Sequence, residues 1–257
     1  MKQLLFACAF LCASFLWARF TAVDPEREFV NSYSYTGNNP LNLIDPDGKQ
    51  VSVHRQVRKG KKDIVTINVY GKLKDDTTPG SNGRGLTKRE MRKVKRQIVR
   101  QFKKTFSGKG SQIIFKGKLH LSIASDEKKI SPHDHVFRVV DNGAIPGTGR
   151  RRGILGRAPF GQKIIYLNRG IVGRTPAKSG PHAGTGRTAQ GGGTMARTGT
   201  HEIGHSMQLR HPVTNTNAGN LMHQTRRSNA GLKVTEHQIL SIESAYKANQ
   251  LNGPQQR

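Results

Sequence analysis

The apolar residues of this chain recur with two different periods. From Thr87 to Phe106 they fall every three or four positions, as on one face of a helix, and Thr87 forms a capping box with Glu90. A further helix is expected from about Thr235 to Asn249. Alternating or continuous apolar runs predict strands over residues 63–73, 111–125, 136–140 and 162–167. This order of strands and helices indicates an α+β fold.

Length and composition limit the domain organisation. The residues from Lys49 to Arg257 suit one domain with a hydrophobic core, although apolar residues make up only 34% of the chain, and no internal repeat is visible. Both cysteines, Cys8 and Cys12, lie near the N-terminus, so disulfide bonds and thiolate ligands are excluded from this domain. The Gly- and Thr-rich residues 178–200 are expected to form a loop.

His201, Glu202 and His205 form the pattern H-E-x-x-H. On a helix, side chains four residues apart lie on the same face, so both histidines can bind one zinc ion while Glu202 flanks the water that completes the zinc shell. Zinc lowers the pKa of that water toward ~7, and the carboxylate accepts its proton as a general base. The segment therefore predicts a helical zinc site with its own base.

A third histidine, His211, follows shortly after this motif. On a continuous helix His211 would lie about 15 Å along the axis from His201, far outside a zinc–nitrogen bond of about 2.1 Å. We therefore expect the helix to end between them, and Pro212 favours an extended conformation at His211. If His211 does not bind the metal, Glu236 or Glu243 in the following helix could supply the third ligand.

These residues resemble the signature of the metzincin zinc metallopeptidases, H-E-x-x-H-x-x-G-x-x-H followed by a Met-turn. The resemblance covers about residues 196–246 and implies a twisted sheet with an active-site helix, a Met-turn and a C-terminal helix. The three histidines take the ligand positions, Glu202 that of the base, and Met222 that of the Met-turn methionine. Gln208 stands where the family has a glycine, so the sequence does not predict how the backbone turns toward the third histidine. Gln224 stands where some members have a metal-binding tyrosine.

A second resemblance concerns residues 19–48, which end in the turn-forming groups Asn38-Asn39-Pro40 and Asp45-Pro46-Asp47-Gly48. As a whole this segment is similar to the closing part of the RHS-repeat-associated core, after which a variable toxin domain begins in that family. The resemblance implies that residues 49–257 are such a toxin domain. Lys49 departs from the family, which usually has an apolar residue there, and the sequence lacks the repeats that build the enclosing shell.

The segment Met1–Ala18 combines one lysine with an apolar run from Leu4 to Trp17. This pattern is typical of a secretory signal peptide, and at about 14 residues the run is shorter than the ~18 to 20 residues that span a bilayer. We therefore expect a secreted protein without a transmembrane span. The alternative is a remnant of gene rearrangement or a start-site artefact, because Arg19 and Phe20 already belong to the RHS-like segment.

The net charge of +27 raises the question of a nucleic-acid partner. Basic residues cover one face of the helix expected over 87–106, namely Lys88, Arg92, Lys95, Arg96, Arg100 and Lys103. Aromatic residues make up only 6% of the chain and do not cluster with these residues, which argues against a stacking platform for single strands. The charge is better explained by non-specific attraction to acidic surfaces, acidic substrates or an acidic immunity or inhibitor protein.

The function that these features support best is a zinc-dependent metalloendopeptidase, secreted and delivered into target cells as a toxin, with a protein or peptide substrate. The expected Zn²⁺ ligands are His201, His205 and His211, the catalytic residue is Glu202, and Met222 forms the Met-turn. Two alternatives stay open, a basic nuclease toxin of the RHS type and a non-catalytic basic binding module. A nuclease would need a cluster of acidic ligands for Mg²⁺, and 16 Asp and Glu residues among 257 are too sparse to suggest one.

Overall fold

The computed structural model of the chain describes residues 51–78, 85–131, 134–149, 151, 153–213 and 218–251. All of them lie within one compact unit, Gln50–Arg257. The expected signal peptide and the RHS-like segment, residues 1–18 and 19–48, lie outside the described residues. Within the described ranges, no helix combines the length and the apolar character needed to cross a membrane.

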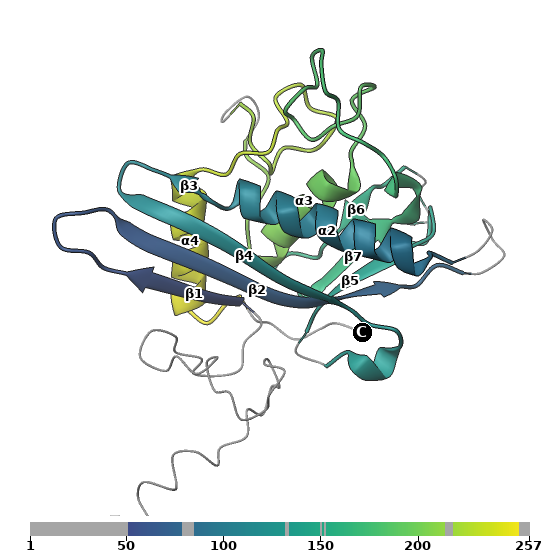
Figure 1. Cartoon of the computed structure of the whole chain (residues 1–257), viewed down its shortest axis with the longest axis horizontal. Coiled ribbons are helices and arrows are strands. Elements are labelled where there is room, and N and C mark those ends of the chain that lie inside the picture. Colours follow the sequence, from purple (N-terminus) through teal and green to yellow (C-terminus); the bar gives the residue numbers. More distant parts are fainter. Residues whose placement is uncertain are drawn as a thin grey trace, which may run out of the picture. The chain divides into compact units, whose positions relative to one another are not determined.

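One mixed sheet forms the base of the fold (Figure 1). The described strands are β1 (Val51–Gln56), β2 (Asp63–Asp75), β3 (Gly108–Lys109), β4 (Ile113–Ile123), β5 (His135–Val140), β6 (Gly156–Arg157) and β7 (Ile164–Asn168). They are ordered β3-β4-β2-β5-β7-β6. Strand β1 pairs with the first half of β2, and β5 pairs with the second half of β2 along the same edge. Strands β4, β2, β5 and β7 run parallel, whereas β1, β3 and β6 are each antiparallel to the neighbour that they pair with.

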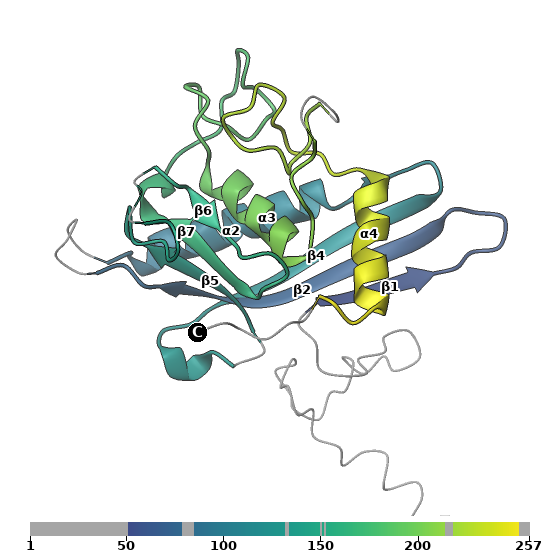
Figure 2. The same ribbon diagram turned by 180° about the vertical axis from the view of Figure 1, so that it is seen from behind.

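Three α-helices of the described residues accompany this sheet: α2 (Lys88–Thr105), α3 (Met195–Ser206) and α4 (Glu236–Lys247). Helix α2 packs along β4 and against α3, while α4 packs against β1 (Figures 1 and 2). Two short 3₁₀ helices, η2 (Glu127–Lys129) and η3 (Arg169–Ile171), follow β4 and β7. The helix α3 thus lies between α2 and the β7–β6 end of the sheet.

The alternating pattern of β4 explains how α2 packs on the sheet. Its buried side chains are Ile113, Phe115, Leu119 and Leu121, and its exposed ones include Lys116, Lys118 and His120. On the facing side, α2 buries Met91, Val94, Ile98 and Phe102. Burial of each such apolar side chain contributes about 1.5 to 3 kcal/mol, so these two rows account for much of the stability of this layer.

The predicted strands and helices are present, with ends shifted by no more than about two residues. The capping box of α2 is confirmed, because Thr87 Oγ1 accepts from the N–H of Glu90 at 3.2 Å and Glu90 Oε2 accepts from the N–H of Thr87 at 2.7 Å. The loop predicted over residues 178–200 is wrong in its last part, because α3 begins at Met195. Strands β1, β3 and β6 were not predicted. The fold is of the α+β class, as expected.

Candidate metal centre

The helix α3 is buried along almost its whole length. Its N-cap is Thr194, whose Oγ1 accepts from the N–H of Arg197 at 3.3 Å and donates to Gly186 O at 2.7 Å. Ten of its 12 residues are buried, among them the polar His201 and Glu202. Buried polar groups need hydrogen-bond partners, so this helix depends on the loops around it.

The helix ends in a Schellman motif that reverses the chain. The N–H of Gln208 donates to His205 O at 2.9 Å, and the N–H of Leu209 donates to Gly204 O at 2.8 Å. Gln208 has a φ of 64°, in the left-handed region that glycine adopts most easily. A glutamine at the position of the family's glycine therefore still makes the turn, and the reversed chain brings His211 back to the helix.

Three imidazole nitrogens converge beside α3. His205 Nε2 lies 3.1 Å from His201 Nε2 and 3.1 Å from His211 Nε2, and the remaining pair is 3.3 Å apart. His201 Nδ1 lies 2.8 Å from Leu221 O. His205 Nδ1 lies 2.8 Å from Leu209 O. A carbonyl oxygen only accepts, so each of these Nδ1 atoms carries the proton and each Nε2 presents its lone pair to the centre.

This arrangement fits a zinc ion. Tetrahedral zinc with bonds of about 2.0 to 2.1 Å to nitrogen places its ligand atoms about 3.3 to 3.4 Å apart, close to the distances between these nitrogens. Lone pairs at this separation repel each other unless a cation lies between them. Burial lowers the pKa of His201 well below its usual value and the pKa of His205 to about 4, so both are neutral at neutral pH, as metal ligands must be. In the described part of the chain, these histidines are the group of side chains that could hold a metal.

Glu202 lies next to the histidines and is buried. Its Oε2 accepts from the N–H of Ala158 at 2.8 Å. Burial raises the pKa of Glu202 to about 8, and the Ala158 hydrogen bond and the charge of Arg197 oppose that rise. Strand β6 approaches α3 closely because it carries glycine, since a Cβ at Gly156 would lie 3.0 Å from Glu202 Oε1 and 2.7 Å from Thr198 Cγ2.

The loop after α3 brings Met222 against the helix. Met222 is fully buried, and its Sδ would lie only 2.5 Å from a Cβ at Gly204, so any other residue at this helical position would displace the Met222 side chain. The N–H of Met222 donates to Asn220 Oδ1 at 2.8 Å, which fixes the turn. The preceding residue, Leu221, supplies the carbonyl that orients His201. The turn and the helix are therefore joined at a candidate ligand.

The two glutamates considered as third ligands lie elsewhere. Glu236 accepts from three backbone N–H groups and one hydroxyl of residues 111–113, at 2.6 to 2.9 Å. Glu243 binds Arg55 at 2.8 Å through Nε and Lys247 at 3.0 Å. The structure therefore brings the three histidines together and leaves both glutamates outside the group.

Arg197, which was not among the residues predicted from the sequence, holds the loop against α3. Its Nη1 donates to Thr225 Oγ1 at 2.7 Å. Its Nη2 donates to His223 O at 2.6 Å and to Leu221 O at 3.2 Å. Arg197 precedes His201 by one helical turn and so shares its face, which is the signal in the sequence that could have identified it.

Arg187 holds the next part of the same loop. Its Nη1 donates to Thr225 O at 3.2 Å and to Arg227 O at 3.1 Å, and its Nη2 donates to Ser228 O at 3.3 Å. Arg187 lies in a Gly- and Thr-rich segment without periodicity, so nothing in the sequence points to this role. The two arginines therefore join residues 221–228 to α3 and to the segment that precedes it.

The histidines and Glu202 line an open cleft of about 680 Å³. Its other walls come from β6, from the glycines at 191–193 before α3, and from residues 224–226 after Met222. Gln224, at the position of the family's tyrosine, is part of this wall. The volume is in the usual range for substrate sites.

No family model and no curated protein matches this sequence. Among solved structures, the chain is similar to archaemetzincin from Methanopyrus kandleri, with a TM-score of 0.39 and 11% identity over 75% of this chain and 99% of that chain. It is also similar to a chain in the structure of a chaperone–substrate complex, with a TM-score of 0.35 and 13% identity over 72% of this chain and 35% of that chain. Both similarities are distant, so the function is inferred from the site itself.

Proposed function

We propose that this chain is a zinc-dependent metalloendopeptidase. The observation that carries the proposal is the convergence of three histidine Nε2 atoms within 3.1 to 3.3 Å of one another, in the same cleft as Glu202. Three protein ligands are typical of catalytic zinc, whereas structural zinc usually has four. His201, His205 and His211 would hold the ion.

Bound zinc would act as a Lewis acid and lower the pKa of water toward about 7. Glu202 is the general base, and its Oε1 is the carboxylate oxygen that the N–H of Ala158 does not occupy. From this position Glu202 takes a proton from the attacking water and returns it to the leaving amine. Its ionised form is favoured by a cation at the histidines, because an opposite charge within about 4 to 6 Å lowers a carboxyl pKa.

The proposal extends to a secreted toxin of the RHS type that an acidic inhibitor protein neutralises. This part rests on the sequences of residues 1–18 and 19–48, which lie outside the described residues, and on the net charge of +27. The open cleft supports endopeptidase rather than exopeptidase activity, because a cleft admits the middle of a polypeptide.

Metal analysis and peptide hydrolysis with the purified full chain test this function. We expect about one zinc per chain, loss of hydrolysis with a chelator and recovery with added zinc, because the ligands bind the ion together. Glu202→Gln should keep zinc and lose roughly 10²- to 10⁴-fold in kcat, the usual contribution of a positioned base. Full activity without metal, or normal activity of Glu202→Gln, would contradict the proposal.

The ligand set has matched controls in the same chain. His211→Ala should weaken zinc binding strongly in competition with a chromophoric chelator, because it removes one of three ligands. Glu236→Ala and Glu243→Ala should bind zinc as the wild type does, since both carboxylates bind other partners. The reverse pattern would assign the site to the class with two histidines and one glutamate.

A further inference from the structure

The walls of the cleft carry an excess of positive charge. Besides the buried Arg197, four arginines line it, Arg151, Arg157, Arg174 and Arg226, whereas Glu202 is the one acidic residue among the described residues that line it. None of the four arginines makes an ion pair with an acidic side chain in the described part of the chain. The acidic residues that form ion pairs bind cations away from the cleft, for example Glu127 with Arg138.

Two of these arginines come from different segments of the chain, and each donates one hydrogen bond to a neighbouring oxygen. Arg157 lies on β6, and its Nη1 donates to Pro146 O. Arg226 lies in the loop after Met222, and its Nε donates to Gln224 Oε1 at 2.9 Å. Neither contact neutralises the guanidinium, because a carbonyl and an amide carry no charge. Each arginine also keeps N–H groups beyond these contacts, since a guanidinium has five.

Positive charges in a cleft with low-dielectric walls attract anions and concentrate them at the site. Guanidinium groups bind carboxylates in pairs of parallel hydrogen bonds, which gives specificity as well as affinity. A nucleic acid is a poorer fit, because no Phe, Tyr or Trp on which bases could stack is among the described residues that line the cleft. The ligand chemistry that suits this wall is therefore a carboxylate on a peptide.

We propose that the substrate is an acidic peptide segment, with Asp or Glu flanking the scissile bond, and that Arg157 and Arg226 determine this specificity by binding its carboxylates. The inference rests on the proposed peptidase function and names the substrate class for the same site. It also gives the high positive charge of the chain a local role that the sequence did not show.

Paired peptides test this proposal. Each pair has the same neutral sequence with Glu or Gln at one position near the scissile bond, and kcat/KM is measured with the zinc-loaded full chain. We expect the Glu peptide to be cleaved about tenfold or more faster than its Gln partner, because a charge-assisted hydrogen bond contributes about that factor. The preference should decrease with salt and should disappear in Arg157→Gln/Arg226→Gln. It should persist in Lys128→Gln, because Lys128 is an exposed basic residue on η2 that does not line the cleft.

Equal rates for the two peptides, or a preference that persists in the double arginine variant, would overturn the inference and leave the peptidase function standing. If no peptide is cleaved, the peptidase function fails, and binding of a fluorescent Glu peptide then tests whether the arginines bind carboxylates. Binding that is lost in the double variant supports this role of Arg157 and Arg226, and absence of binding to the wild type overturns it. If a single-stranded oligonucleotide displaces the peptide and its own binding needs both arginines, the ligand of the cleft is a nucleic acid and the proposed acidic peptide is wrong.

Discussion

Gln208 holds a backbone conformation that costs free energy for most residues with a Cβ, because left-handed φ angles are adopted most easily by glycine. Its side chain offsets part of this cost, since Nε2 donates to Gln250 O at 2.7 Å. That hydrogen bond is exposed, so its net contribution is small. The turn that returns His211 to the site is therefore maintained against a local strain.

Substitutions at Gln208 measure this strain. Gln208→Val should lower the free energy of unfolding by about 1 to 2 kcal/mol, because a β-branched residue fits the left-handed region poorly. Gln208→Gly should be at least as stable as the wild type and should still bind zinc. Urea denaturation checks both variants. A valine variant as stable as the wild type would show that the chain does not make this turn in solution.

For single residues, local spacing decides what the sequence can predict. His201 and His205 are recognisable because one helical turn separates them, and the need for a break before His211 follows from the length of a helix. Arg157 and Arg226 are far apart in the sequence, and only the folded chain places both at one cleft. No local pattern identifies such a pair.

Among the strands and helices, regular periodicity made β4 and α2 predictable from the sequence. Strands β3 and β6 contain two residues each, which is too short for any period to show. The importance of β6 comes from Gly156, which lets it approach α3, and this depends on tertiary packing. The strand that lies against Glu202 therefore leaves no pattern in the sequence.

The hydrogen bonds that join α3 to the loop at residues 221–228 lead to a prediction about zinc affinity. Arg197→Met should reduce zinc affinity by about 10- to 100-fold, because Arg197 fixes the loop whose Leu221 carbonyl orients His201. Competition with a chromophoric chelator measures the affinity, and urea denaturation of the zinc-free chain measures stability separately. Reduced stability with unchanged zinc affinity would limit Arg197 to a structural role.

For the whole molecule, the buried His135 makes stability depend on pH. His135 is fully buried, and neither ring nitrogen has a hydrogen-bond partner in the described part of the chain. Burial, with a further contribution from the charge of Lys163, lowers its pKa from 6.5 to about 3. The unfolded chain therefore binds a proton between these pH values that the folded chain excludes. Stability is fully present above pH 6.5 and falls as the pH decreases toward 3.

His135→Leu should remove this pH dependence. Relative to the wild type, the variant should gain about 2 kcal/mol in free energy of unfolding on going from pH 7 to pH 5, at about 1.4 kcal/mol per pH unit below 6.5. Urea denaturation at both pH values gives the change in free energy of unfolding for each protein. The contribution of the metal-site histidines cancels in the comparison, because both proteins carry them. Equal changes in the two proteins would contradict the neutral, buried state of His135.

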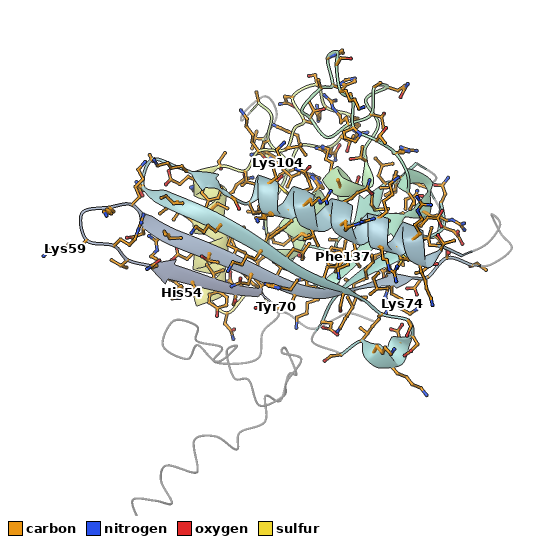
Figure 3. All side chains as sticks on the ribbon, viewed as in Figure 1. His54, Lys59, Tyr70, Lys74, Lys104 and Phe137 are labelled. Atoms are coloured by element: carbon orange, nitrogen blue, oxygen red, sulfur yellow. The ribbon has the colours of Figure 1, made fainter. Side chains whose placement is uncertain are left out.

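The surface charge of the molecule includes the basic side of α2, the helix that carries Lys104 in Figure 3. Reversing Lys95, Arg96 and Arg100 to Glu should slow association with an acidic polymer at low salt by about tenfold or more, with a smaller effect at high salt. Hydrolysis of a small neutral peptide should not change, because none of the three residues lines the cleft. A loss of hydrolysis would mean that α2 takes part in catalysis.

The carbonyl oxygen of Leu221 accepts from two donors of α3, His201 Nδ1 and Arg197 Nη2. The same loop carries Arg226 into the cleft. A metal at the histidines and a carboxylate at Arg226 would therefore act on one short segment, and we expect each to favour the binding of the other. Coupling of this kind is reciprocal, so zinc tightens the binding of an acidic substrate by the same factor by which that substrate tightens zinc. In the proposed peptidase, an acidic substrate would thus protect the site against loss of its metal.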